Sequence, residues 1–355
     1  GYVAFASGIP TWLFMLYAGV VADRISRRSL LLVTQTSMMI LAFILAGLTF
    51  LRLVQPWHII LLAFGLGVAN AFDAPARQAF VLEMVGREDL TNAIALNSAM
   101  FNSATAFGPA IAGLTYALFG PGWCFSLNGI SFIAVIVALL AMRNLNPQPI
   151  PEQPNSVLAD LKEGLSYVLS HSMIRVLIGL VGMTTLFGVS FATLIPAWTV
   201  TILHGNASVN GFLFSARGLG ALISALSIAS LGRFKFKGKL LTLGTFAFPI
   251  CLFAFALLRL LPLSLLALVA VGWASILIFN LANALVQTLT SDQLRGRVMS
   301  IYSFTFFGLM PVGGLLAGAV AEKVGEPITV MLWSLVLLGS AASIFTLLPK
   351  VRELQ

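Results

Sequence analysis

Apolar stretches of about 20 residues recur along this chain from one end to the other, and they constrain its fold more than any other feature. A helix needs a stretch of about this length to cross the hydrocarbon core of a bilayer. Five stretches come first, then a polar segment, and then six more. The sequence therefore predicts an all-α membrane protein with eleven transmembrane helices, near 1–22, 30–51, 57–77, 92–119, 123–142, 173–202, 209–231, 240–260, 262–288, 298–320 and 327–349.

The composition fits a multi-pass membrane protein. The chain is 59% hydrophobic and 9% charged, whereas soluble domains carry about 25% charged residues. Its net charge of +8 does not indicate a nucleic-acid partner, because the cations lie in short loops between spans. Such loops stay on the cytoplasmic side of a membrane. This rule places the C-terminus in the cytoplasm, together with Arg24, Arg27, Arg28, Arg87, Arg143, Lys162, Arg233, Lys235, Lys237, Lys239, Arg295, Arg297, Lys350 and Arg352.

A polar segment divides the chain into two halves. The proline-rich run 146–154 predicts an extended linker. Apolar residues then recur with helical period over 157–169, with charged residues between them. This pattern predicts an amphipathic helix at the cytoplasmic interface, either a plain connector or a regulatory element. The predicted domains are an N-terminal bundle over 1–143, a linker with its amphipathic helix over 144–172, and a C-terminal six-helix bundle over 173–355.

An internal repeat relates the two halves. A polar triplet with the spacing i, i+3, i+7 occurs in each: Asn70, Asp73 and Arg77 in the third span, and Asn280, Asn283 and Gln287 in the ninth. The same offset relates Gly86-Arg87 to Gly296-Arg297. Several matches at one offset indicate a duplication. Because the second half has six spans, we expect two pseudo-symmetric bundles of six helices, with the first of twelve helices missing from this chain.

The run Gly-Val-Val-Ala-Asp-Arg-Ile-Ser-Arg-Arg over residues 19–28 brings a glycine, an acid and three arginines to the end of the first span. A glycine lets two helices approach closely. The acid and the arginines can then pair or separate as those helices shift. We expect a latch here, at a cytoplasmic hinge between the two bundles, formed by Gly19, Asp23, Arg24, Arg27 and Arg28.

Two six-helix halves, a central cytoplasmic loop and the run 19–28 together resemble the major facilitator superfamily, in which a similar motif lies between helices 2 and 3. Ser26 departs from the glycine that many members have at that position. The resemblance covers the chain from family helix 2 onward and implies the major facilitator fold. It also implies that the third and ninth visible spans are helices 4 and 10, which line the central cavity.

The fourth span contains Gly108-Pro109-Ala110-Ile111-Ala112-Gly113, which is similar to the glycine–proline signature of helix 5 in antiporters of that superfamily. A proline frees a backbone carbonyl and bends a helix, and glycines allow close packing. The resemblance adds Gly108, Pro109 and Gly113 to the expected gating residues and favours export. The segments 75–78 and 93–97 resemble the branch that contains siderophore and macrolide exporters.

Charged side chains within a span carry a free-energy cost of about 2.5–3.5 kcal/mol, so each needs a reason. Asp73 and Arg77 are four residues apart on one predicted helix and can pair directly. Three roles stay open for them: a structural ion pair, a gate that exchanges partners with Asp23 and Arg24, or a site at which Asp73 binds the driving proton.

Polar side chains in other spans are candidates for lining a substrate cavity. Arg217 lies within the span that begins near Val209, and it extends to the outer interface, forms a structural pair, or faces the cavity and attracts an anionic cargo. The remaining candidates are amide side chains, which either bond a neighbouring helix or face water: Asn70, Asn97, Asn280, Asn283 and Gln287.

Enzyme and metal-site signatures are not visible in the sequence. His58, His171 and His204 are too scattered for a metal site. The run 232–240 has five residues between its glycines where a phosphate loop has four, so we predict no nucleotide and no other cofactor.

The resemblance implies a secondary active transporter in a bacterial inner membrane, specifically a proton-coupled exporter of small amphipathic molecules such as a drug, a macrolide or a siderophore. We expect it to act as a monomer. An importer of the same fold, an uncoupled channel and a lipid-handling membrane protein are the alternatives.

Overall fold

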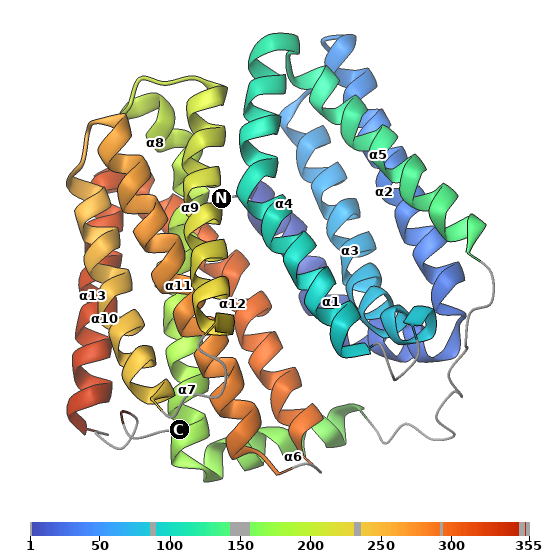
Figure 1. Ribbon diagram of the computed structural model, residues 1–355. Helices are drawn as coiled ribbons and strands as arrows, with labels where there is room; N and C mark the ends of the chain where they lie inside the picture. The colour runs from blue at the N-terminus through green and yellow to red at the C-terminus, as the bar shows by residue number, and fades with distance from the viewer. Residues whose placement is uncertain are drawn as a thin grey trace. The chain divides into compact units, whose positions relative to one another are not determined.

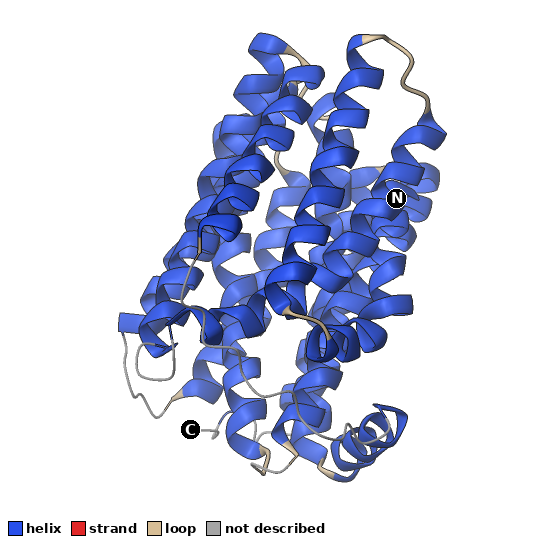
Figure 2. Ribbon diagram, turned by 90° about the vertical axis from the view of Figure 1, so that its right-hand side faces the viewer, coloured by secondary structure: helices blue, strands red, loops and turns tan. Residues whose placement is uncertain are grey.

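The computed structural model describes residues 2–85, 90–142, 157–230, 236–291, 294–347 and 352. All regular structure in these ranges is helical (Figure 2). A helix bonds its backbone groups within itself, which lipid requires of a spanning segment. The elements, labelled in Figure 1, are α1 (Tyr2–Arg24), α2 (Arg27–Phe50), α3 (Pro56–Val85), α4 (Leu90–Phe119), α5 (Pro121–Ala141), α6 (Val157–Ser170), α7 (Ser172–Met183), η1 (Thr184–Gly188), η2 (Val189–Leu194), α8 (Ile195–Thr201), α9 (Ala207–Ser230), α10 (Lys237–Leu257), α11 (Leu261–Leu289), α12 (Arg295–Val324) and α13 (Glu326–Leu347).

The predicted all-α membrane fold is confirmed. By length and composition, nine segments of the described residues are long and apolar enough to cross a membrane, counting the run from α7 to α8 as one. The first and fourth predicted spans correspond to α1 and α4, which contain the shorter apolar stretches Tyr2–Phe14 and Ala106–Phe119. The count of eleven transmembrane helices therefore stays a prediction.

The span predicted near 173–202 is not one continuous α-helix. After α7, the backbone forms a π-helical turn, η1, and then a 3-10 segment, η2, before α8 begins. Pro196 occupies the first turn of α8 and has no N–H to continue a helical ladder into the preceding turn. Ser190 also bonds back to the carbonyl of Leu186 at 2.7 Å, a contact that bends helices. Both features favour a local change of helical type.

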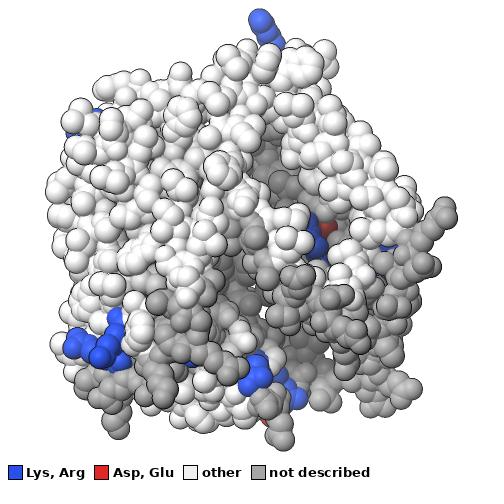
Figure 3. Space-filling view, viewed as in Figure 1, with Lys and Arg blue, Asp and Glu red and all other residues white. Residues whose placement is uncertain are grey.

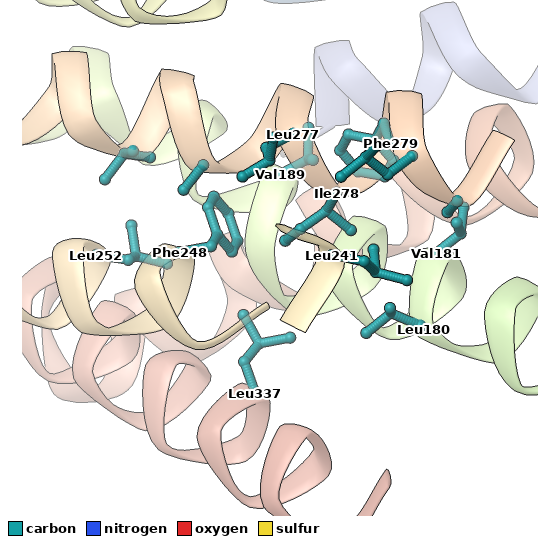
Figure 4. Close-up of a cluster of buried hydrophobic side chains, with 14 of the residues drawn as sticks. Leu180, Val181, Val189, Leu241, Phe248, Leu252, Leu277, Ile278, Phe279 and Leu337 are labelled. Atoms are coloured by element: carbon teal, nitrogen blue, oxygen red, sulfur yellow. The ribbon is translucent and has the colours of Figure 1, made fainter. Parts of the chain in front are cut away.

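The chain forms two compact units. Unit 1 comprises Asn102–Gly113 of α4 and Leu158–Gln355, together with Gly1, and unit 2 comprises Tyr2–Phe101 and Leu114–Val157. The larger buried cluster lies in unit 1, where α7, η2, α10, α11 and α13 bring their apolar faces together. Figure 4 shows part of this cluster, in which Phe248 of α10 lies among leucine, isoleucine and valine side chains from neighbouring elements.

Unit 2 has a smaller buried cluster, formed by Leu30, Leu31, Ala76, Phe80 and Leu139. These residues come from α2, α3 and α5, so the cluster joins three helices. It lies where α2 begins and α5 ends, next to the contact between Arg28 and Leu139. The candidate site described below borders this cluster.

Glycines set the closest helix contacts in both units. The carbonyl of Val269 lies against Gly220, and the carbonyl of Arg217 lies against Gly272, so neither glycine has room for a side chain. In unit 2, Gly67 of α3 is held in the same way against the carbonyl of Ser7 of α1. Lipid supplies no hydrophobic drive between helices, and small residues at crossings are what permit tight van der Waals packing.

The predicted amphipathic helix is present as α6. Gly164 lies against Arg297 and Ile301 of α12, and the carboxylate of Glu163 pairs with the guanidinium of Arg297 at 2.6 Å. The helix is thereby fastened to the beginning of α12. Residues 143–156, which include the predicted linker, lie outside the described residues.

Candidate functional site

A buried carboxylate marks the candidate site in unit 2. Asp73 lies 17 residues into α3, about 26 Å along the helix at 1.5 Å per residue. Only 1% of its surface is exposed. A carboxylate in such a place is stable only if neighbouring groups satisfy its oxygens.

Two side chains from α2 satisfy one carboxylate oxygen. The hydroxyl of Thr34 and the amide nitrogen of Gln35 each lie 2.8 Å from Oδ1 of Asp73. Both partners are themselves buried. These hydrogen bonds join α2 to α3 through a charged acceptor, and such bonds are stronger than those between neutral groups.

The hydroxyl of Thr34 can serve either protonation state of Asp73. It lies 3.0 Å from the carbonyl of Leu31 as well as 2.8 Å from the carboxylate. A hydroxyl has one proton to donate and lone pairs to accept with. It can donate to an ionised Asp73, or it can donate to the carbonyl of Leu31 while accepting from a protonated Asp73. The hydroxyl therefore offers a hydrogen bond to either form of the carboxyl group.

Arg77 pairs with the other carboxylate oxygen, Oδ2, one helical turn further along α3. The side chain of Arg77 is 59% exposed, whereas that of Asp73 is 2% exposed. The cation stays solvated and the carboxylate does not. Loss of Arg77 would therefore leave the buried carboxylate with one fewer partner. An uncompensated buried charge destabilises a fold much more than an uncompensated exposed charge does.

An apolar groove of about 720 Å³ runs between α2 and α3 and reaches this cluster. Thr34 lines it, so the groove passes beside the donor to Asp73. Its other walls are largely apolar and include Val33, Leu41, Phe64 and Phe72.

Arg28, predicted as a latch residue, binds the end of another helix. Its Nε and Nη2 atoms each donate at 2.8 Å, to the carbonyls of Leu139 and Leu140 respectively. These carbonyls belong to the last turn of α5, where four acceptors have no intrahelical partner. A cation at this position also complements the negative end of the helix dipole. Arg28 therefore holds α2 to α5.

The glycine–proline segment of α4 lies against α9 within unit 1. Ser215 accepts a hydrogen bond from the backbone N–H of Ala110 at 2.8 Å. A Cβ atom on Gly113 would lie 2.7 Å from the carbonyl oxygen of Ala207 and 3.0 Å from the Cα atom of Gly211. A Cβ atom on Gly108 would meet nothing within 4 Å. Of the two predicted glycines, only Gly113 occupies a tight crossing.

The second polar triplet is partly joined. The amide nitrogen of Gln287 donates to the side-chain oxygen of Asn283 at 2.6 Å, so the residues that match Arg77 and Asp73 also form an i, i+4 pair. Nearby, the hydroxyl of Tyr302 donates to the carbonyl of Phe279 at 2.9 Å and links α12 to α11.

The other predicted residues are placed separately. Asn70, Asn97 and Asn280 are exposed. Arg217 is partly buried on α9 against α11. Gly19, Asp23 and Arg24 belong to a stretch of α1 in which the structure does not describe side chains. The predicted contact of Asp23 and Arg24 with Asp73 therefore stays a prediction.

Sequence reasoning missed Thr34, Gln35 and Ser215. The first two belong to the polar run 34–37 within the otherwise apolar span of α2, and a polar run at such a place is a visible signal of a buried partner. Their connection to Asp73 depends on the register between two helices, which periodicity does not give. Ser215 carries no such signal, because isolated serines are common in spans.

Basic side chains of unit 1 gather where α7, α10 and α12 begin. Arg175, Lys237, Lys239, Arg295 and Arg297 all lie in the first turns of these helices. Figure 3 shows blue side chains toward the lower edge of this unit and few elsewhere on the face in view. The three helices therefore start from the same, basic side of the unit.

Solved transporter structures resemble this fold. The nucleoside transporter NupG superposes with a TM-score of 0.69 at 14% identity, covering 98% of this chain and 89% of that one. A transporter of the POT family, solved with a thioalcohol-conjugated peptide, superposes with a TM-score of 0.72 at 13% identity, covering 99% and 88%. At these identities the likeness concerns the fold alone.

Sequence relatives are transporters. The staphyloferrin A transporter of Staphylococcus aureus is 25% identical over 92% of this chain and 81% of its own length. The multidrug efflux pump Tap of Mycolicibacterium fortuitum is 28% identical over 99% and 87%. The enterobactin exporter EntS of Escherichia coli is 29% identical over 86% and 73%. The family model described as transmembrane secretion effector matches residues 2–355, and the chain therefore belongs to this family of major facilitator transporters.

Proposed function

We propose that this membrane transporter is a proton-coupled exporter of small amphipathic molecules, such as a drug, a macrolide or a siderophore, in a bacterial inner membrane. Cargo binds near the middle of the bilayer, and two helical bundles rock to expose it to one side and then the other. The relatives that are named as exporters or efflux pumps support the direction and the class of cargo. The basic ends of α7, α10 and α12 support a cytoplasmic C-terminus, since α13 ends on that same side.

The observation that carries the proposal is the buried carboxylate of Asp73. Among the described side chains, it is the carboxylate that lies farthest from a helix end, since Glu163, Glu322 and Glu326 all lie in terminal turns or on α6. Ionisable groups at such depth in transporters mark proton relays, ion pathways or substrate sites, and a proton relay is the role that this proposal assigns to Asp73. The hydroxyl of Thr34 can satisfy Asp73 with or without its proton, which a reversible proton site requires.

The arginines of the run 19–28 form the latch in this proposal. Arg28 holds the end of α5, and Arg77 holds Asp73, so both contacts of unit 2 depend on charge-assisted bonds that protonation or movement can release. Asp23, Arg24 and Arg27 would exchange partners with them during rocking, and Gly19 would allow the close approach of the helices that this requires. Pro109 removes one backbone N–H from α4 and Gly113 makes the close crossing, so a moving helix would pivot at this segment.

The test uses the full-length protein in proteoliposomes, with ethidium and erythromycin as separate probes. An imposed pH gradient should drive accumulation of at least one probe, and a protonophore should abolish it. Accumulation that continues unchanged after the gradient collapses would rule out proton coupling.

The variant Asp73→Asn should retain probe binding but lose most of the gradient-driven transport, because the neutral amide cannot exchange a proton. Glu163→Gln is the matched control, since it removes a carboxylate that is 55% exposed and far from the spans' interior. Equal transport by the two variants would show that Asp73 has only a structural role.

A further inference from the structure

Arg217 occupies an unusual position within unit 1. It lies ten residues from the beginning of α9 and thirteen from its end, which is about 15 Å and about 20 Å along the helix. A charged side chain at such a depth is unfavourable unless something compensates it.

The side chain projects from the buried face of α9. Three residues share the face of α9 from which Arg217 projects: Leu213, four residues before it, Gly220, three residues after it, and Ser224, seven residues after it. Each lies within about 60° of Arg217 around the helix axis. All three are buried. The exposed residues Phe212, Leu219 and Ile223 lie about 120–160° away, on the opposite side. Arg217 therefore faces the interior of its unit.

The packing of α9 on α11 fixes this orientation. The carbonyl of Arg217 lies against Gly272, and Gly220 lies against the carbonyl of Val269 three residues further along the crossing. With glycines on both helices, neither backbone can rotate without a clash. A turn of α9 that moved the guanidinium out toward lipid would break this crossing.

The guanidinium makes no hydrogen bond or ion pair with any residue in the described ranges. The described carboxylates of unit 1 are Glu163, Glu322 and Glu326, and Glu163 already pairs with Arg297. Five N–H donors of Arg217 are thus left without a protein acceptor. Buried arginines without a partner are rare, because an uncompensated buried charge destabilises the fold strongly.

An irregular segment of the backbone lies at a similar depth. The hydroxyl of Thr199 in α8 meets the side-chain oxygen of Asn210 in α9 at 3.4 Å. From Asn210, Arg217 lies about 10 Å further along α9. From Thr199, about 10 Å back along the chain passes the beginning of α8 and reaches η2, so Arg217 and η2 lie at a similar depth. Interrupted helices at the middle of a bilayer form binding sites in many transporters. The unpaired cation and the interrupted helix are two independent features at a similar depth in unit 1.

We propose that Arg217 binds an anionic group of the cargo, and specifically a carboxylate. This inference rests on the proposed export function and adds a substrate class to it. The planar guanidinium presents two parallel N–H groups, which match a carboxylate in a bidentate arrangement. The cargo supplies the negative charge that the described residues of unit 1 do not bring to Arg217, and it releases Arg217 again when it leaves.

The test compares two probes that differ at one group. Rhodamine 110 carries a carboxylate, and rhodamine 123 is its methyl ester. Full-length protein in proteoliposomes with an imposed pH gradient should transport rhodamine 110 in preference. Arg217→Gln should lower the ratio of acid to ester transport about tenfold, as expected for loss of a charge-assisted pair. Arg217→Lys should restore part of the ratio.

Arg175→Gln is the control, because it removes a cation at the beginning of α7 that bonds only the carbonyl of Leu169. Its ratio should equal that of the unchanged protein. An equal loss of both probes in Arg217→Gln would overturn the inference and indicate a structural role. If that variant does not fold, the transport of the two probes by the unsubstituted protein still tests the inference. Equal transport of rhodamine 110 and rhodamine 123 would refute selection of a carboxylate. Failure to export either rhodamine, ethidium or erythromycin would instead refute the export function itself.

Discussion

A methyl group added at Gly113 should separate α4 from α9, whereas the same change at Gly108 should not. In Gly113→Ala the new carbon would lie 2.7 Å from the carbonyl oxygen of Ala207 and 3.0 Å from the Cα atom of Gly211. Carbon atoms in favourable contact are about 3.5–4.0 Å apart. Both neighbours are backbone atoms, so no side chain can turn aside, and α4 must retreat by about 0.5–1 Å.

The expected magnitude follows from two contributions. Overpacking of this kind destabilises by about 1–3 kcal/mol. The same retreat would stretch the 2.8 Å bond between the N–H of Ala110 and Ser215 beyond hydrogen-bonding distance, and its loss adds about 0.5–1.5 kcal/mol. Each 1.4 kcal/mol is about a tenfold change in an equilibrium, so the conformation that holds this crossing should become at least several-fold less populated.

Two measurements check this: the melting temperature of the purified full-length protein in detergent, and its rate of ethidium transport in proteoliposomes. Gly113→Ala should lower both. Gly108→Ala should leave both unchanged or raise the melting temperature slightly, because nothing lies within 4 Å and alanine favours a helix by about 1 kcal/mol over glycine. If the two variants behave alike, Gly113 does not lie against the backbone of Ala207 and Gly211 in the way that this reasoning requires.

Two further predictions concern the cluster around Asp73. Thr34→Val keeps the shape of the side chain but removes a donor to a buried carboxylate, so it should lower the free energy of unfolding by about 1–3 kcal/mol, as read from chemical denaturation. Ser37→Ala, whose hydroxyl bonds only the carbonyl of Val33 on its own helix, should change it by much less, and equal effects would contradict the assignment. Asp73→Asn and Arg77→Gln, measured singly and together, should show a coupling of about 0.5–3 kcal/mol, and strictly additive losses would count against the pair.

The helices and the Asp73–Arg77 pair could be predicted, because both depend on residues that are close together in the sequence. Apolar length predicts a spanning helix, and lipid leaves the backbone no other way to bond within an isolated stretch. The pairing of Asp73 with Arg77 follows from their spacing on one helix. Thr34 and Gln35 could not be predicted as their partners, because the register of α2 against α3 depends on packing between residues distant in the sequence.

The interruption between α7 and α8 was missed for a related reason. Its hydropathy lies within the range of the continuous spans, and hydropathy does not respond to the hydrogen-bonding pattern of the backbone. Pro196 gives a local signal, but proline is tolerated within transmembrane helices such as α4, which continues through Pro109. Only the packed neighbours, such as Phe248 against Gly188, distinguish the two cases.

The two polar triplets, which the predicted internal repeat relates to each other, have the same i, i+4 geometry but different chemistry. Asp73 and Arg77 pair across one turn of α3, and Asn283 and Gln287 pair across one turn of α11, with the same direction from donor to acceptor. The first pair is ionic and the second is neutral. A neutral amide pair satisfies itself at every stage of a cycle, whereas an ionic pair changes its strength when the carboxylate gains a proton. In the proposed transport cycle, a change of charge at Asp73 would therefore alter the pair on α3 and leave the amide pair on α11 unchanged.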